Sequence, residues 1–246
     1  MSLEVFFFGA FGLAFGSFGN VLLLRLKRGE SLLGRSHCMS CKRILGVFDL
    51  IPVLSYALLG GRCRWCSRHI SLQYSIVEMF SAVLFILAAI LFPTDLPRAV
   101  LTAGLLYVLL LACVFDVLYE KLPDVCSLTI AFLGLVLAAM THHLSSSLLG
   151  AALALVWFGG QWILSQHRAV GTGDIFLSSA LALWLGFRGT IAMLLLSYVV
   201  GAISVLLLLG LGTISMKQKR IAFGPFLAMG AVLSMLGVGQ VYLPFF

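Results

Sequence analysis

Charged side chains are scarce in this sequence. Of its 246 residues only 10% are charged, whereas soluble domains carry about 25%. Acidic residues number only nine, 61% of the residues are hydrophobic, and the mean hydropathy is +1.12. This composition excludes an ordinary soluble domain and predicts an integral membrane protein.

The sequence also lacks the short segments of alternating polarity that build a membrane β-barrel. Its apolar runs are continuous and approach the roughly 17–25 residues that a spanning helix needs. The first run has no basic residues before it and no good cleavage site, so we expect a retained helix rather than a signal peptide. The fold class predicted is therefore all-α, with about eight membrane helices, at residues 3–24, 72–92, 98–116, 124–140, 147–165, 175–187, 190–211 and 222–241.

The count is seven or eight because the sixth run is short, and the basic residues favour eight. Nine of the 16 Lys and Arg residues lie in the loop after the first helix. If that loop is cytoplasmic, eight helices place 14 basic residues inside and leave only Arg98 and Arg188 outside, as the positive-inside rule requires. The net charge of +7 then describes a basic face toward anionic lipid headgroups. Nucleic-acid binding is not indicated.

Four cysteines in the first loop predict a metal site. The order is C-x2-C, 21 intervening residues and C-x2-C, at Cys38, Cys41, Cys63 and Cys66. Two such turns complete a tetrahedral Zn²⁺ site, and four thiolates leave no position for a catalytic water. Disulfides are the alternative, but a cytoplasmic loop is a reducing environment. We therefore expect one structural zinc ion per chain, which supplies folding energy to a loop with little core.

The remaining histidines and cysteines near these positions have simpler interpretations. His37 and His69 flank the cysteine turns and are expected to be surface residues, since four cysteines already suffice. Cys113 and Cys126 have no partner at metal-ligand spacing, so apolar packing is expected for both.

Polar residues cluster at the cytoplasmic ends of the predicted helices. A carboxylate inside a membrane helix costs about 2.5–3.5 kcal/mol at its centre and less near the interface, so one such residue could be incidental. Asp124 follows Pro123 and could be an ordinary acid at a helix start. Six groups on one membrane face predict a shared polar cavity formed by Asn20, Glu78, Asp116 at the end of its helix, Asp124, Gln161 and Asp174.

Asp116 and Asp174 come from different helices and could converge. Two close carboxylates do not both ionise cheaply, so one keeps a proton. The charged acid can activate water while the protonated one polarises an amide carbonyl, which is peptide hydrolysis without a metal. Gly171 and Gly173 would give a substrate backbone room to approach, although a helix-entry turn also explains them. The sequence contains no H-E-x-x-H motif or Ser/His/Asp set; a proton-coupled transporter remains the alternative, and a zinc-dependent scaffold is the third reading.

An ordered series of motifs is similar to the type IV prepilin peptidases, also called leader peptidases/N-methyltransferases. The series covers nearly the whole chain: "GSFGNVLLLRL" at 16–26, the cysteine loop and following helix at 36–82, "FDVLYEKLPD" at 115–124, "GTGDIFLSSALALWLG" at 171–186 and "FGPFLAMG" at 223–230. The GxGD motif alone is weak, but the ordered set is specific. Position 19 is a glycine where the family usually has a larger apolar residue.

The resemblance implies roles for individual residues. The catalytic pair falls on Asp116 and Asp174, and the zinc ligands fall on the four loop cysteines. Substrates would be prepilins or pseudopilins, cut on the cytoplasmic side after a short basic leader. Many family members then methylate the new N-terminus with S-adenosylmethionine, and Gly61 and Arg62 match the family positions for that step, with arginine where lysine is common. No G-x-G-x-x-G turn for a nucleotide cofactor is visible.

Three regions and a location follow as expectations. Residues 1–24 form the first membrane helix, 25–71 the zinc domain, and 72–246 the polytopic catalytic domain. Active-site support is expected from Asn20, Glu78, Asp124, Gly171 and Gly173. The resemblance implies a multi-pass protein of the bacterial inner membrane, with membrane lipid and pilin precursors as its partners.

Overall fold

The computed structural model describes residues 2–31, 34–168, 170–212 and 222–237. Helices dominate these residues, in which extended structure is limited to isolated bridges between His37 and Ile44 and between Arg62 and His69. The chain forms two compact units, Met1–Leu110 and Leu111–Phe246.

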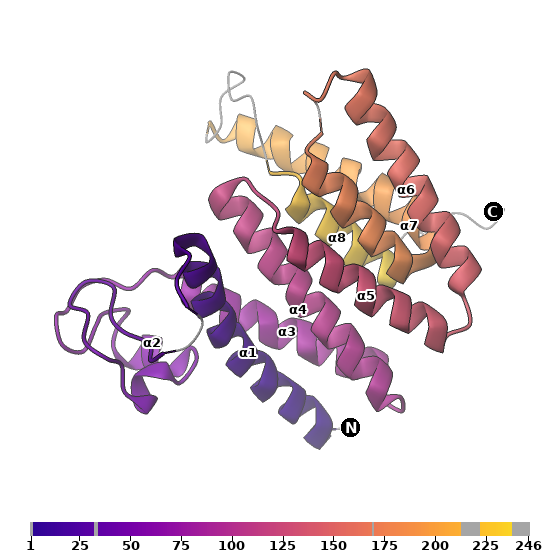
Figure 1. Ribbon diagram of the computed structural model, residues 1–246. Helices are drawn as coiled ribbons and strands as arrows, with labels where there is room; N and C mark the ends of the chain where they lie inside the picture. The colour runs from indigo at the N-terminus through magenta and orange to yellow at the C-terminus, as the bar shows by residue number, and fades with distance from the viewer. Residues whose placement is uncertain (1, 32–33, 169, 213–221, 238–246) are drawn as a thin grey trace. The chain divides into compact units, whose positions relative to one another are not determined.

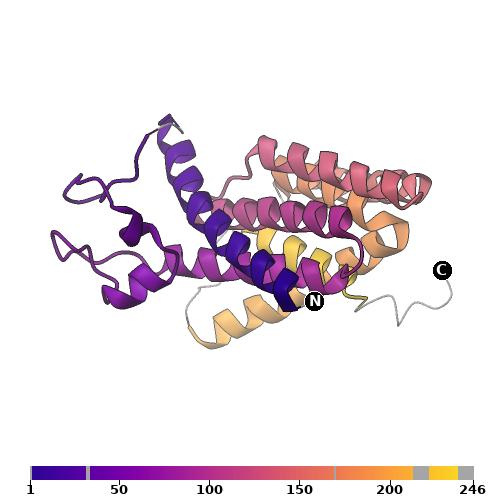
Figure 2. The ribbon, with the colours of Figure 1, turned by 90° about the horizontal axis from the view of Figure 1, so that it is seen from below.

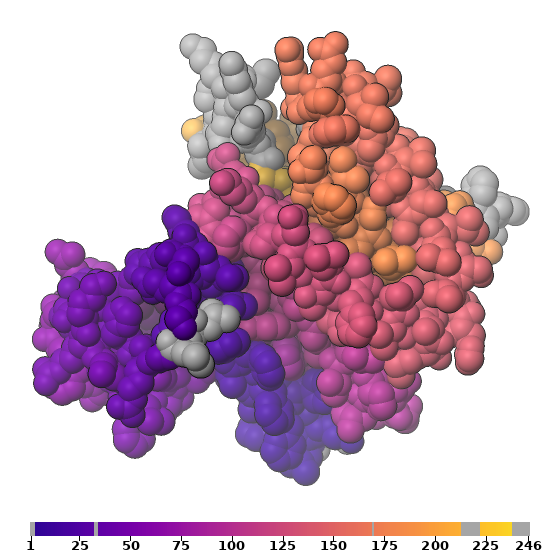
Figure 3. Space-filling view, in the orientation of Figure 1, coloured from indigo at the N-terminus to yellow at the C-terminus, as the bar shows by residue number. Residues whose placement is uncertain are grey.

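Unit 1 holds two membrane helices and the loop between them. Its elements are α1 (Ser2–Arg28), η1 (Val47–Leu50), α2 (Leu54–Leu58), α3 (Gln73–Leu91) and the first part of α4 (Leu96–Tyr119). Helices α1 and α3 pack against each other (Figures 1 and 2). The ring of Phe15 stacks on Phe85 at 5.6 Å, and the Tyr107 hydroxyl donates to the Phe15 carbonyl at 2.9 Å. The loop lies against the C-terminal end of α1 (Figures 1 and 3).

Unit 2 is a helix bundle built around one long helix. Its elements are the rest of α4, α5 (Asp124–Met140), α6 (Leu144–Leu164), α7 (Thr172–Gly210) and α8 (Gly224–Met235). Helix α7 contacts α5, α6 and α8 (Figure 1). It is therefore the central helix of the unit.

The protein is a multi-pass membrane protein. In the described part of the chain five helices, α1, α3, α4, α6 and α7, are long and apolar enough to cross a bilayer, and α5 and α8 are shorter apolar helices. Large apolar side chains on these helices point outward, for example Phe6, Leu128 and Val156, each more than 60% exposed. Such a surface is stable in lipid and unfavourable in water.

Helix α7 is kinked at Gly186, close to the gap expected between the helices at 175–187 and 190–211. Gly186 has φ 71° and ψ −179° inside the helix, a conformation available to glycine without steric cost. The polar groups freed by the kink are bonded: Ser146 accepts the Phe187 N–H at 3.0 Å, and Thr190 donates to the Gly186 carbonyl at 2.7 Å. The predicted helices 175–187 and 190–211 are thus the two arms of α7. With both arms counted, the apolar helical segments of the described residues match the eight expected.

Some predicted boundaries differ from the structure. Helix α4 continues to Tyr119, so the prediction that Asp116 ends its helix is wrong; the apolar residues after it extend the helix by a turn. The last helix begins at Gly224 and ends at Met235, and the rest of the expected span to 241 lies partly outside the described residues, as do Lys217, Lys219 and Arg220. The proposed limits of the zinc and catalytic domains stay predictions, since the compact units divide at Leu110 instead.

Candidate functional site

Asp116 is a buried carboxylate held by the start of another helix. It lies in the last turns of α4 with 6% of its surface exposed. Its Oδ2 accepts the backbone N–H of Gly224, the first residue of α8, at 3.0 Å. The N-terminal end of a helix favours a negative group because its N–H groups have no partner in the helix. The α8 start therefore fixes one oxygen of Asp116.

Asp174 occupies the third position of α7 and is held locally. Its Oδ2 accepts the N–H of Gly171, the N-cap residue of α7, at 3.3 Å. This is one of the two bonds of a capping box, since glycine has no side chain to make the other. The carboxyl is partly buried. The "GTGD" sequence therefore forms the turn that starts α7, and this turn orients the Asp174 side chain.

The two aspartates belong to the same unit and lie within electrostatic range of each other. Asp116 interacts electrostatically with Asp174, although the two residues lie on different helices. The segments that carry them also touch: a Cβ at Gly173 would stand 2.9 Å from the Cβ of Leu122, in the turn between α4 and α5. Gly173 therefore permits a close approach of the two motifs, in addition to any approach by substrate. Two acids beside each other can hold one proton in common.

The other two predicted polar residues of unit 2, Asp124 and Gln161, have local structural surroundings of their own. Asp124 is exposed and is the first residue of α5, directly after Pro123, as expected for an acid at a helix start. Gln161 exchanges hydrogen bonds with Tyr198, at 2.9 and 3.1 Å. Its amide is thus engaged by an aromatic hydroxyl of α7.

Asn20 and Glu78 belong to unit 1, so a cavity common to all six polar residues is not a feature of either unit. Glu78 Oε2 accepts the Val53 N–H at 2.7 Å. Val53 has φ 61°, an unfavourable conformation for a β-branched residue. Asn20 Nδ2 donates to the carbonyls of Gly16 at 3.2 Å and Tyr74 at 3.0 Å. Both residues thus connect segments of unit 1. A polar residue near a helix end can therefore have a structural role as well as a chemical one.

Gly224 is a site residue that sequence reasoning did not single out. A Cβ at this position would stand 2.7 Å from Asp116 Oδ2, so no larger residue fits without moving the carboxylate. A weak indication was available, since Gly224 precedes Pro225 at a helix start in the quoted "FGPF" motif.

The four loop cysteines form a cluster that could hold a metal ion. All four Sγ atoms lie within 4.8 Å of one another, and those of Cys38 and Cys66 are 3.9 Å apart. A tetrahedral site with Zn–S bonds of about 2.3 Å has sulfurs about 3.8 Å apart, so these residues fit zinc. None of the described histidines belongs to the cluster.

The two cysteine turns have the same hydrogen bonds. Lys42 N–H donates to the Cys38 carbonyl and Ser67 N–H to the Cys63 carbonyl, each at 2.9 Å. The backbone N–H of Cys41 is the main cause that lowers the pKa of the Cys38 thiol to about 6. Burial and hydrogen bonds with the other thiols raise the pKa of the Cys66 thiol to about 11, so without a metal only part of the cluster is in the thiolate form that binds metal.

The residues assigned to methyl transfer lie beside the second turn. Gly61 is buried with φ 68°, and a Cβ there would stand 2.8 Å from the Tyr56 hydroxyl. Arg62 is exposed.

Comparisons with known proteins agree over most of the chain. Residues 10–92 match the family model described as the bacterial peptidase A24 N-terminal domain, and residues 103–206 match the type IV leader peptidase family. The leader peptide-processing enzyme of type 4 prepilin-like proteins from Escherichia coli O78:H11 is 31% identical, over 94% of this chain and 91% of its own. The prepilin leader peptidase/N-methyltransferase of Legionella pneumophila is 32% identical, over 92% and 89%. No solved structure gives a significant match.

Proposed function

Because the chain belongs to the type IV leader peptidase family, we propose that Asp116 and Asp174 are the catalytic pair of a membrane-embedded aspartyl endopeptidase. The substrates are the leader peptides of type IV prepilins or pseudopilins. The observation that supports this assignment is the close approach of the two motifs within unit 2, where a Cβ at Gly173 would stand 2.9 Å from the Cβ of Leu122. Family membership leaves the transporter and scaffold hypotheses without support.

The chemistry follows from one shared proton. The ionised carboxylate takes a proton from water as the water oxygen attacks the scissile carbonyl carbon. The protonated carboxyl polarises the carbonyl oxygen, and the C–N bond then breaks as the leaving amine receives a proton from the pair. Gly224 N–H holds one oxygen of Asp116 at 3.0 Å, which keeps that acid oriented throughout.

The four cysteines are proposed to bind one structural zinc ion. Their mutual spacing and their all-thiolate donor set suit zinc better than a hard cation. The ion would cross-link the two cysteine turns and stabilise the loop between α1 and α3.

The second activity is N-methylation of the newly exposed N-terminus, with S-adenosylmethionine as methyl donor. The printed names of several relatives carry the term N-methyltransferase. The basic loop is proposed to face the cytoplasm, since 14 of the 16 basic residues fall on that side if eight segments span the membrane. The aspartates would then act at the cytoplasmic face of the inner membrane.

The assignment is tested with purified protein in detergent and a prepilin leader substrate. Asp116→Asn and Asp174→Asn should each lose nearly all cleavage, about 10²–10⁴-fold in rate. The matched control is Asp95→Asn, because Asp95 accepts the Arg98 N–H at the other end of α4 and should retain cleavage. Retained cleavage in either of the first two variants removes that residue from the mechanism.

A further inference from the structure

The elements η1 and α2 of the cysteine loop have an apolar outer face. They contact each other, and none of their residues, all of which are described, is buried. One side of the two elements lines an internal cavity of unit 1, through residues such as Leu50 and Leu59. Four apolar residues, each more than 50% exposed, do not line that cavity and form what we call the loop face: Val47, Phe48, Leu54 and Leu58. An exposed apolar face of this kind marks a contact surface.

A hydrogen bond of Val53 sets the level of the loop face relative to the membrane. Val53 lies between η1 and α2, and its N–H donates to Glu78 Oε2 at 2.7 Å. Helix α3 has 19 residues, a length of about 28 Å at 1.5 Å per residue, which is close to the roughly 30 Å thickness of the hydrocarbon core. The first turns of α3 therefore lie at the edge of that core. Because Glu78 is in the second turn, Val53 and the loop face beside it lie at the boundary between acyl chains and headgroups.

The surface of α3 at this level is also apolar. Met79 and Phe80, the residues that follow Glu78, are both exposed, as expected for side chains that face lipid. The lipid-facing surface of α3 thus begins at the height at which Val53 is bonded. A lipid bilayer that surrounds α3 would therefore reach the loop face.

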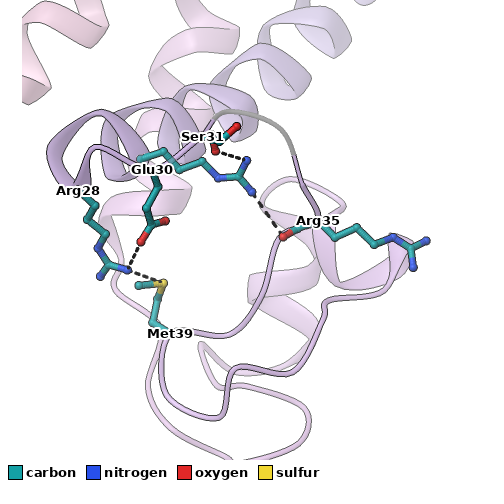
Figure 4. Close-up of polar contacts among 6 residues, drawn as sticks. Arg28, Glu30, Ser31, Arg35 and Met39 are labelled. Atoms are coloured by element: carbon teal, nitrogen blue, oxygen red, sulfur yellow. Dashed lines mark hydrogen bonds and ion pairs between the residues drawn. The ribbon is translucent and has the colours of Figure 1, made fainter.

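The charge of the cysteine loop complements anionic lipid. Residues 29–72 contain six Lys or Arg residues and only two acids. Both acids are paired with arginines: Glu30 lies 3.7 Å from Arg28 (Figure 4), and Asp49 lies 2.7 Å from Arg64. The loop thus keeps an excess of positive charge, which anionic headgroups attract.

An exposed tryptophan of the same loop is typical of a membrane interface. The guanidinium of Arg43 lies 3.9 Å from the centre of the Trp65 ring, and both side chains are exposed. Tryptophan is enriched at the level of lipid headgroups because its ring is amphipathic, and arginine can bind phosphate there. This pair therefore suits the same partner as the loop face.

We propose that the cysteine loop docks on the lipid bilayer through the loop face. The apolar side chains enter the boundary of the acyl chains, and the basic residues contact anionic headgroups. The two cysteine turns come before and after η1 and α2 in the sequence, so the contact would hold the metal site close to the membrane surface. The proposal does not depend on the peptidase or methyltransferase function, since it uses only the membrane location of the helices.

The first test identifies what covers Phe48. The zinc-loaded full chain with Phe48→p-benzoylphenylalanine is placed in nanodiscs of phosphatidylcholine and phosphatidylglycerol and illuminated. Lipid should become attached at position 48, as it should in the positive control, Phe80→p-benzoylphenylalanine on α3. Attachment at position 48 only to another segment of the chain or to an added basic leader peptide would overturn the proposal, and so would no attachment at position 48 while position 80 is labelled.

The second test measures amide hydrogen exchange over residues 47–58 in the same nanodiscs. Phe48→Ser/Leu58→Ser should make this exchange about tenfold faster, which corresponds to about 1.4 kcal/mol of lost apolar burial. The matched control is Ile44→Ser, because Ile44 is also an exposed apolar residue of the loop but lies on neither element; its exchange over residues 47–58 should stay close to that of wild type. Wild-type exchange in the double variant would contradict the proposal. If the double variant loses its zinc, the cross-linking result decides.

Discussion

Glu78 in unit 1 and Asp116 in unit 2 are both buried carboxylates on apolar helices, 7% and 6% exposed, and each accepts a backbone N–H from a distant segment. Their other neighbours differ. Glu78 also lies beside the Ser17 hydroxyl, a neutral donor. Asp116 instead lies within electrostatic range of two other acids, Glu120 on its own helix and Asp174.

The difference teaches how to separate structural from reactive polar groups in a membrane. A carboxylate surrounded by neutral donors is a tether, because its bonds are complete in the resting protein. A carboxylate beside another carboxylate has a proton to exchange. Four predictions test this contrast, beginning with the largest expected effect.

Removal of the zinc ligands should cause the largest loss of stability, and the loss should begin in the cysteine loop of unit 1. Cys38→Ser/Cys63→Ser should reduce the zinc content from about one ion per chain to none, because structural zinc sites are worth about 10–16 kcal/mol. Metal analysis and protease sensitivity of the loop measure this. Cys113→Ser/Cys126→Ser is the control and should keep its zinc; a metal-free wild type would contradict the assignment.

The aspartates should act as a unit. Each single Asn variant should lose about 10²–10⁴-fold in cleavage rate, and Asp116→Asn/Asp174→Asn should lose no more than the worse single variant, as expected for residues in one catalytic device. Single-turnover cleavage measures the rates. Additive losses would show that the two acids work in separate steps.

Gly224→Ala should reduce cleavage about 10²-fold, because its Cβ would displace the Asp116 carboxylate and small misplacements of catalytic groups have effects of that size. Gly160→Ala serves as the control, since a Cβ there meets nothing within 4 Å and alanine favours helix. Equal activity of the two variants would show that Gly224 at the start of α8 does not position the Asp116 carboxylate.

Glu78→Ala should have the smallest effect, a loss of about 1–2 kcal/mol from the unpaired Val53 N–H. Hydrogen exchange at Val53 should become faster. Glu78→Gln keeps an acceptor oxygen and should restore most of the protection. Unchanged exchange in the alanine variant would mean that Glu78 is not a tether.

Much of this arrangement was predictable from the sequence, for identifiable reasons. Long apolar runs located the helices because each span must bury its own backbone polar groups, and the C-x2-C spacing located the cysteine cluster because both turns are local. Gly186 was harder to interpret, since a kinked helix and two separate helices have the same apolar pattern.

Long-range partners were not predictable in the same way. The Gly224 N–H meets Asp116 across 108 positions, and Val53 meets Glu78 across 25. No periodicity or composition carries that information. The cavity expected for six polar residues stays a prediction, because Asn20 and Glu78 belong to unit 1 and the other four to unit 2.

The bond between Glu78 and Val53 also divides the chain segment that connects α1 to α3. Val53 lies near the middle of the segment from residue 29 to 72, with Cys38 and Cys41 before it and Cys63 and Cys66 after it. One long connection thus becomes two shorter closed ones, each of which contributes one cysteine pair. Since the entropic cost of closure rises by about 0.6 kcal/mol for each doubling of loop length, a carboxylate in the membrane helix lowers the cost of bringing the two halves of a metal site together.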